Sequence, residues 1–264
     1  MTDFPQDKIE EQIAEPVKAT NPEPISPPKP KRKRPKRKKK IGFFKLFGYF
    51  IIGLLLWVLL LRFLPVPFTI LMVQRAFEGD KIRYHPVSIN KINPSMVAAV
   101  IAAEDARFCQ HNGFEFEAMK RAAKANSQGK KLRGASTISQ QTAKNVFLWP
   151  ARSYVRKGFE AGFTVLIETL WGKRKIMEDY LNVAEMGDGV FGVEAASKYY
   201  FNKHAKDLSL GEASRLAAIL PSPQKWRVNR PGPYVARRSS RIAGGGRVVI
   251  DNNLYSCVYK RGII

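Results

Sequence analysis

Acidic residues and cysteines are both scarce in this sequence. Its 264 residues include 22 Asp and Glu against 45 Lys and Arg, which gives a formal net charge of +23. The two cysteines, Cys109 and Cys257, belong neither to a Cys-x-x-Cys pair nor to a Cys/His spacing typical of metal ligands. The sequence therefore suggests neither a disulfide framework nor a structural zinc site, and it leaves open whether the two cysteines pair.

The shortage of acidic residues is not confined to one end of the chain. Residues 1–62 hold 14 Lys and Arg and 6 Asp and Glu, which leaves 31 and 16 for residues 63–264 and a net charge of +15 there. A surface with this charge favours anionic partners. On charge alone, nucleic acid, anionic lipid head groups and pyrophosphate-linked substrates all fit.

The first 40 residues contain few aromatic residues. Residues 1–30 are rich in Pro, Glu and Lys, a composition that predicts disorder. Residues 29–40 then place ten Lys and Arg among twelve residues. Such a run is also typical of nucleic-acid patches, but an apolar stretch follows it at once, so the positive-inside rule explains it better. We predict a disordered, basic, cytoplasmic tail over 1–40 and no nucleic-acid partner.

Charge is absent from residues 46–61. With Lys45 and Arg62 at its ends, this apolar stretch reaches the roughly 20 residues that a bilayer span requires. No small-x-small cleavage site follows it, and the preceding segment is too long for a cleaved signal peptide. These features predict one transmembrane helix over 41–62, with the remainder of the chain outside the cytoplasm.

Alternating strand patterns are also missing beyond residue 62. Helical periods separated by short Gly and Pro breaks predict a mainly α domain over 63–240. Residues 63–73 are apolar but interrupted by two prolines and too short to span. They belong either to the core or, as their position after the predicted span favours, to a surface that lies on the membrane. The GGG at 244–246 predicts a helix break, and the structure of the C-terminal tail over 241–264 is left unassigned.

A carboxylate falls on the apolar face of one predicted helix. Asn93 and Pro94 are typical of a helix start. From Val97 the apolar positions recur at i, i+3 and i+4, and Glu104 occupies i+7. Two interpretations are open: Glu104 has a buried Arg or Lys partner, or it is partly desolvated with a raised pKa that suits a general base.

Four segments of the sequence resemble, in their order along the chain, the motifs of a known family. They are 104–113 (EDARFCQHNG), 134–145 (GASTISQQTAKN), 156–160 (RKGFE) and 175–182 (KIMEDYLN). Together they resemble the signature motifs of the family 51 glycosyltransferases, the peptidoglycan glycosyltransferases, and within that family the monofunctional biosynthetic transglycosylases. The resemblance covers about residues 94–223 and implies a lysozyme-like, two-lobed helical domain.

The resemblance implies a role for individual residues. Glu104 would be the catalytic base and Glu160 the second catalytic carboxylate. The residues implied to bind substrate are Ser136, Gln140, Gln141, Lys144, Arg152 and Arg156. The residues implied to build the structural motifs are Asp105, Phe108, His111, Gly113, Glu178 and Asn182. No residue is assigned to a metal, and a divalent cation, Mg²⁺ or Mn²⁺, at the pyrophosphate is the one cofactor left open. Arg156 and Glu160 are also i, i+4 neighbours and are expected to pair.

The implied reaction is polymerisation of lipid II with inversion and release of undecaprenyl pyrophosphate, on the periplasmic side of a bacterial inner membrane. The implied partners are lipid II, the growing glycan strand and membrane lipids, and other proteins of cell wall synthesis or division are left open. Residues 126–133, polar and glycine-containing, are predicted to form a flap over the site.

The competing interpretation is a lysozyme-like peptidoglycan hydrolase or a lytic transglycosylase, which also presents a carboxylate to a glycan. The cationic second and third motifs oppose it, because a neutral glycan needs no pyrophosphate site. A tethered basic scaffold would not explain the two motif carboxylates. A transpeptidase domain is excluded, since no Lys-Thr-Gly follows the three Ser-x-x-Lys matches and the remaining chain is too short.

Overall fold

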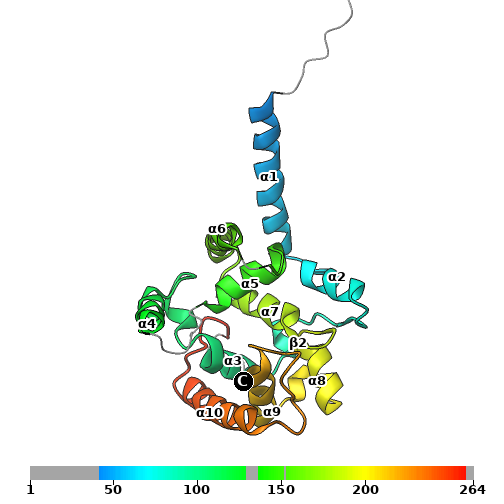
Figure 1. The fold of residues 1–264 in the computed structure, drawn as a ribbon, viewed down its shortest axis with the longest axis vertical. Helices are drawn as coiled ribbons and strands as arrows, with labels where there is room; N and C mark the ends of the chain where they lie inside the picture. Colours follow the sequence, from blue (N-terminus) through cyan, green and yellow to red (C-terminus); the bar gives the residue numbers. More distant parts are fainter. Residues whose placement is uncertain (1–41, 129–135, 152, 260–264) are drawn as a thin grey trace, which may run out of the picture. The chain divides into compact units, whose positions relative to one another are not determined.

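The computed structural model describes residues 42–128, 136–151 and 153–259 (Figure 1). The tail predicted over 1–40 lies outside these residues, as do Arg152 and most of the flap predicted over 126–133. Within the described part the chain is mainly helical, and one long apolar helix precedes the domain. This confirms the predicted fold class.

The helix α1 (Phe43–Leu61) covers the charge-free stretch. Among the described residues it is the one helix long and apolar enough to cross a membrane, and most of its side chains are exposed. Its last turns contact the domain: the indole nitrogen of Trp171 donates to the carbonyl of Val58 at 2.8 Å, and Arg62 donates to the carbonyl of Leu170. The anchor therefore ends against the start of the globular part.

The segment after α1 keeps apolar side chains on its surface. Helix α2 (Ile70–Phe77) is capped by Thr69, whose hydroxyl accepts from the amide of Met72 at 3.2 Å. Phe63, Phe68 and Phe77 are exposed around it. Contact of this surface with a membrane stays a prediction.

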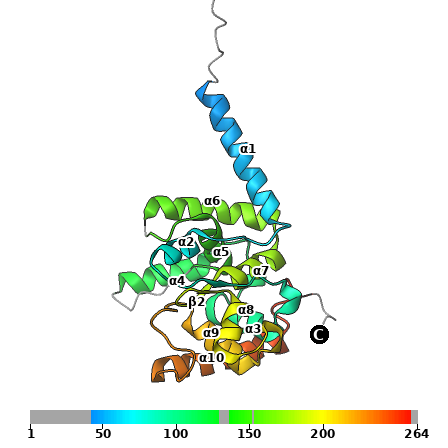
Figure 2. The same ribbon diagram turned by 90° about the vertical axis from the view of Figure 1, so that its right-hand side faces the viewer.

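The other helices form two groups that pack within themselves. Helices α3 (Pro94–Glu104), α9 (Leu210–Ile219) and α10 (Pro233–Asp251) contact one another, and α5 (Ile138–Phe147) contacts both α6 (Tyr154–Leu170) and α7 (Lys173–Val183). Figure 2 shows α6 and α10 on opposite sides of the domain, with α5 and α7 nearer α6. The smaller elements are α4 (Phe116–Ser127), α8 (Val193–Phe201), η1 (Ile89–Lys91), η2 (Phe108–Gln110) and η3 (Ala205–Asp207).

One small sheet joins a strand near the start of the domain to two adjacent strands about 100 residues later. It contains β1 (Arg83–Tyr84), β2 (Glu185–Gly187) and β3 (Val190–Phe191) in the order β1-β3-β2. The β1-β3 pair is parallel and the β2-β3 pair is antiparallel. Gly192, at φ +82°, follows β3 because a Cβ there would lie 2.3 Å from the carbonyl oxygen of Asn182.

Helix α3 begins and ends as its sequence predicts. The Asn93 side chain accepts from the amide of Ser95 at 3.0 Å, and Pro94 occupies the first turn. Its side chains from Met96 to Ile101 are buried. Glu104 is the last helical residue, so the apolar helix carries this carboxylate to the boundary between the two groups.

The helix break predicted at 244–246 is wrong, because α10 continues through the three glycines to Asp251. A Cβ at Gly245 would lie 3.0 Å from Cβ of Ala102, and one at Gly246 would lie 2.9 Å from Cδ1 of Leu210. Gly245 and Gly246 let α10 approach α3 and α9 closely, which opposes a helix-propensity cost of about 1 kcal/mol for each glycine. Gly244 has no neighbour within 4 Å of its Cβ position. Helix α10 also crosses the domain end predicted at 240.

Candidate active site

Glu104 has a partner from each helical group. Nε2 of Gln141, on α5, donates to Oε2 at 3.2 Å, and Nη2 of Arg238, on α10, donates to Oε1 at 3.1 Å. The carboxyl side chain is 15% exposed. Burial raises the pKa of Glu104 above its usual range, while the Gln141 hydrogen bond and the Arg238 charge oppose the rise. Both interpretations left open by the sequence therefore hold: Glu104 has an arginine partner and a raised pKa.

Arg238 is the main contact that sequence reasoning missed. Its Nε also donates to the carbonyl of Ala218 at 3.1 Å, which fixes the guanidinium between α9 and Glu104. It lies 134 positions from Glu104 in the chain. A long-range contact of this kind leaves no spacing to read in a single sequence.

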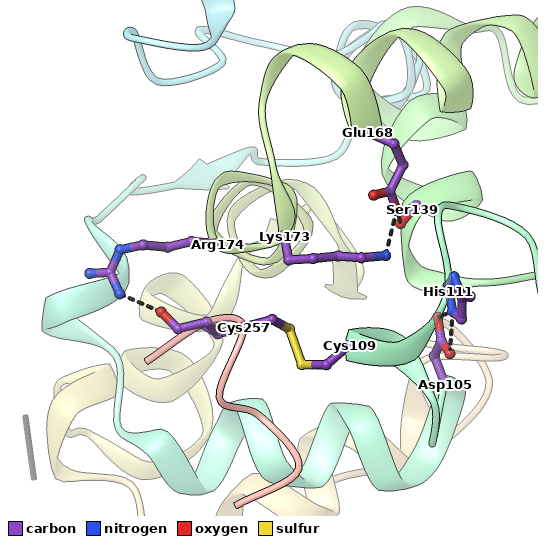
Figure 3. The surroundings of a disulfide bond; sticks show 9 residues. Asp105, Cys109, His111, Ser139, Glu168, Lys173, Arg174 and Cys257 are labelled. Carbon is purple, nitrogen blue, oxygen red and sulfur yellow. Dashed lines mark hydrogen bonds and ion pairs between the residues drawn. A yellow bond between two sulfur atoms is a disulfide. The ribbon is translucent and has the colours of Figure 1, made fainter. Parts of the chain in front are cut away.

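The turn after Glu104 is held by Asp105 and His111 (Figure 3). Asp105 is buried, and its carboxylate accepts from the amide of Ile138 at 3.0 Å and from Nε2 of His111 at 2.9 Å. Nδ1 of His111 accepts from the amide of Gly113 at 3.1 Å. Because Nδ1 accepts, the ring proton lies on Nε2 and points to Asp105. Both residues therefore hold the turn to the start of α5, and the structural role that the resemblance implies for them stays a prediction.

Gly113 closes this turn against α6. Its φ is +88°, and a Cβ there would lie 2.7 Å from Cγ2 of Thr164 and 3.1 Å from Cγ of Glu168. Its carbonyl accepts from the hydroxyl of Thr137 at 2.6 Å. Only glycine fits both this backbone conformation and this space. Through the contacts of Gly113 with Thr137 and Thr164, the turn after α3 is packed against α5 and α6.

Glu160 is the second carboxylate, and it is only 3% exposed. Nη1 of Arg156 lies 2.9 Å from Oε2, which confirms the predicted pair, and Lys157 donates to Oε1. Lys157 also donates to the hydroxyl of Ser136 at 3.3 Å. Sequence reasoning missed Lys157, although its i, i+3 spacing from Glu160 was a usable signal. Nε of Arg156 is buried without a hydrogen-bond partner among the described residues.

Lys144 lies in α5 between the two carboxylates. Its side chain makes no hydrogen bond or ion pair within the described part of the chain, but it interacts electrostatically with both Glu104 and Glu160. Burial lowers the pKa of Lys144; Glu160 opposes this shift, while Arg156 and Lys157 add to it. A half-buried cation without a direct partner is suited to receive an anionic group.

The other predicted site residues have structural contacts. Gln140 is buried and completes the capping box of α5 with Thr137, so the structure places it in a helix cap rather than at an exposed binding position. Glu178 accepts from the amide of Ile89 at 2.8 Å, and Asn182 exchanges hydrogen bonds with the backbone of Val87. Phe108 is fully buried.

The residues do not form a metal site of their own. The described ranges include no group of three or more His, Cys, Asp or Glu side chains placed to hold an ion. The carboxylate nearest the cations, Glu160, is already paired with Arg156 and Lys157. A divalent cation that arrives with a pyrophosphate stays a prediction.

The fold is a mainly helical domain that follows an apolar helix, and the site holds two carboxylates among several cations. These features are typical of an enzyme that uses acid–base catalysis on an anionic substrate. A family model described as Transglycosylase matches residues 72–245. The chain is 53% identical over 213 residues to the biosynthetic peptidoglycan transglycosylase of Caulobacter vibrioides, covering 81% of this chain and 93% of that protein. The chain belongs to the transglycosylase family.

Two further relatives with the same name are similar over most of their length. The protein of Bdellovibrio bacteriovorus is 52% identical over 199 residues, covering 73% of this chain and 80% of that protein. The protein of Pseudomonas aeruginosa is 48% identical over 206 residues, covering 75% of this chain and 88% of that protein. In all three, the shared region is long enough to include the whole site.

Proposed function

We propose that this chain polymerises lipid II into β-1,4-linked glycan strands and releases undecaprenyl pyrophosphate, as a step of cell wall biosynthesis. The observation that carries the proposal is the pair formed by Glu104, a partly desolvated carboxylate with a raised pKa, and Lys144, a half-buried cation without a direct partner. The first suits proton abstraction and the second suits an anionic leaving group. The names of the relatives support the substrate.

Glu104 acts as the general base. It takes the proton from the 4-hydroxyl of the acceptor lipid II, and the oxygen attacks C1 of the sugar at the lipid-linked end of the strand. The bond from C1 to the phosphate oxygen breaks, its electron pair leaves with the pyrophosphate, and the configuration at C1 inverts. A raised pKa strengthens the carboxylate of Glu104 as a base.

The leaving group requires cations fixed before the reaction. Lys144 is available for a direct contact, and the nearby charge of Arg156 adds to the positive potential there. Arg152 is assigned to the same role by its place in the motif. Cations placed in advance stabilise the charge that develops on the pyrophosphate, and they do so more strongly in a partly desolvated site.

The direct test is incubation of the purified full chain with lipid II, followed by separation of polymer from smaller products. The proposal expects long strands and free undecaprenyl pyrophosphate. Hydrolysis of preformed glycan to soluble disaccharides, without polymer from lipid II, would instead support the lysozyme-like hydrolase or the lytic transglycosylase.

We also propose that the amino terminus is cytoplasmic and the domain periplasmic, because ten basic residues precede α1. Protease added to spheroplasts is expected to degrade the domain and to leave the tail intact. Detection by antibodies against each end reports the two fragments separately. Loss of the tail alone would reverse the orientation and contradict the proposed function.

Lys144→Met is expected to lower kcat/KM by about 10²–10³-fold, because it removes one preplaced cation from the leaving-group site. Folding should change little, since the side chain gives up no hydrogen bond or ion pair with a described residue. Lys206→Met, at an exposed lysine, is the control for the change in net charge. If Lys144→Met melts early but keeps full activity per folded molecule, Lys144 is structural.

Arg238→Met is expected to move the acid limb of the pH–rate profile to higher pH. The Arg238 charge lowers the pKa of Glu104, so its removal raises that pKa further, and the base becomes protonated at a higher pH than in the wild type. Arg237→Met removes a neighbouring exposed charge and is the control. An unchanged acid limb in Arg238→Met would show that the ion pair does not tune the base.

A further inference from the structure

The structure pairs the two cysteines whose state the sequence left open. Cys109, in η2, is joined to Cys257, which follows α10, across a separation of 148 residues and a Cα–Cα distance of 5.5 Å. Figure 3 shows the bond beside the Asp105–His111 pair. The C-terminal segment is therefore attached covalently to the turn that follows Glu104.

The segment that carries Cys257 is itself fixed to the domain. The hydroxyl of Tyr259 donates to the carbonyls of Ile89 and Ile92, at 3.2 Å each. Nη1 of Arg174 donates to the carbonyl of Val258 at 2.5 Å. Tyr255, Val258 and Tyr259 are all buried. The disulfide thus links the turn to a rigid neighbour and not to a free end.

The other side of η2 rests on a polar network. The ammonium group of Lys173 lies 4.5 Å from the ring centre of Phe108 and 2.6 Å from a carboxylate oxygen of Glu168. The same oxygen accepts from the hydroxyl of Ser139 (Figure 3). Residues 105–113 therefore lie between this network and the disulfide, and both limit their movement.

We infer that the Cys109–Cys257 disulfide is a positioning element for the general base, which gives residues 252–259 a part in holding the site. The inference rests on the proposed function. Cys109 is five residues from Glu104, and α10 supplies Arg238 to the same carboxylate. One C-terminal unit therefore contacts the base segment twice, through an ion pair and through a covalent bond.

Release of the bond would act on the base through the turn. Without it, η2 can move away from residues 252–259, and Asp105 with it, so water reaches Glu104 more easily. Burial is the main cause of the raised pKa, so the pKa would fall and the base would weaken. Among the described residues, the charged or titratable groups that face Glu104 are Asp105 of the turn, Lys144 of α5, Tyr180 of α7 and Arg238 of α10.

The test uses the fact that the chain has two cysteines and no others, so a thiol reductant acts on this bond alone. Reduction by a phosphine breaks the Sγ–Sγ bond and leaves two thiols: the phosphine supplies two electrons, and one water supplies the two protons and the oxygen that converts the phosphine to its oxide. The full chain in detergent is assayed with lipid II before reduction, after reduction and after reoxidation. Temperature is kept well below the melting point of the reduced protein.

The expected result is a fall in kcat of tenfold or more, little change in KM, and an acid limb moved to lower pH, opposite to the shift expected for Arg238→Met. Reoxidation should restore all three. Cys257→Ser should have the kcat, KM and acid limb of the reduced wild type, and the reductant should not change them. Leu208→Ala, which truncates a buried side chain outside the site, is the control for lost stability and should keep kcat per folded molecule.

Two outcomes would overturn the inference. A reduced protein that melts earlier but keeps kcat and the pH profile would show that the bond only stabilises the fold, as any cross-link over a long loop does. Free thiols in the purified, unreduced protein would show that the bond is not formed. Failure of the proposed function is distinguishable, because the oxidised wild type would then make no polymer.

Discussion

Glu104→Gln is expected to abolish polymerisation and to leave the fold at least as stable as the wild type at neutral pH. The amide keeps the shape of the side chain and its contact with Gln141 but cannot accept the hydroxyl proton. A lost general base lowers kcat by about 10²–10⁴-fold.

The stability side follows from the raised pKa of Glu104. The carboxyl group of Glu104 binds its proton more tightly in the folded protein than in the unfolded chain. The folded protein therefore loses stability as the pH rises from the pKa of Glu104 in the unfolded chain to its higher pKa in the folded protein. The amide removes that cost. Arg238 loses its counter-charge, but it is 23% exposed, and partial hydration limits the loss.

Thermal melting and polymer yield, measured on one preparation at several pH values, separate the two effects. Glu117→Gln, at an exposed carboxylate of α4, is the matched control. If Glu104 were only a structural partner of Arg238, its neutralisation would cost about 3–5 kcal/mol and activity would fall only with the folded fraction. A stable Glu104→Gln protein that still polymerises lipid II would make Glu160 the next candidate for the base.

The parts of the site that the sequence predicts are those set by short-range order. Helix α3 has its cap, its first-turn proline and its apolar period within a dozen residues, so the place of Glu104 at its end follows directly. The pair of Arg156 and Glu160 follows from i, i+4 spacing on one helix. Each rests on periodicity or capping within one element, which a single sequence contains.

The features of the site that the sequence does not predict depend on contacts between elements that are distant in the chain. Arg238 reaches Glu104 because α10 packs on α3, and the same packing brings Gly245 close to Ala102 and Gly246 close to Leu210. Local propensity alone predicts a break there, and the tertiary packing overrides it. The pairing of Cys109 with Cys257 depends on the same packing, since residues after α10 return to η2.

Gln140 shows a different limit. Its motif position implied substrate contact, but a glutamine three residues after Thr137 also completes a capping box. Both interpretations use the same residue type at the same position. The structure shows the capping contact, in which the buried Gln140 side chain accepts from the amide of Thr137, and substrate contact by Gln140 stays a prediction.

Glu160→Gln is expected to lose both activity and stability, in contrast to Glu104→Gln. Glu160 is 3% exposed and has two cationic partners, Arg156 at 12% and Lys157 at 45% exposure. Its neutralisation leaves the guanidinium of Arg156 buried without a counter-charge, close to the charge of Lys144. Breaking a buried pair from one side costs about 3–5 kcal/mol, and the exposure of Lys157 places the expected loss at the lower end of that range.

Denaturant unfolding of wild type, Glu160→Gln and the double variant Glu160→Gln/Arg156→Met tests this ion pair. The double variant removes both charges of the buried pair, so it should recover part of the stability lost by the single variant, because no uncompensated guanidinium remains. It should recover no activity, since Arg156 is also needed by the leaving group. Recovered activity would show that Arg156 and Glu160 serve only each other, and an unchanged stability in Glu160→Gln would show that Lys157 and water already screen the site.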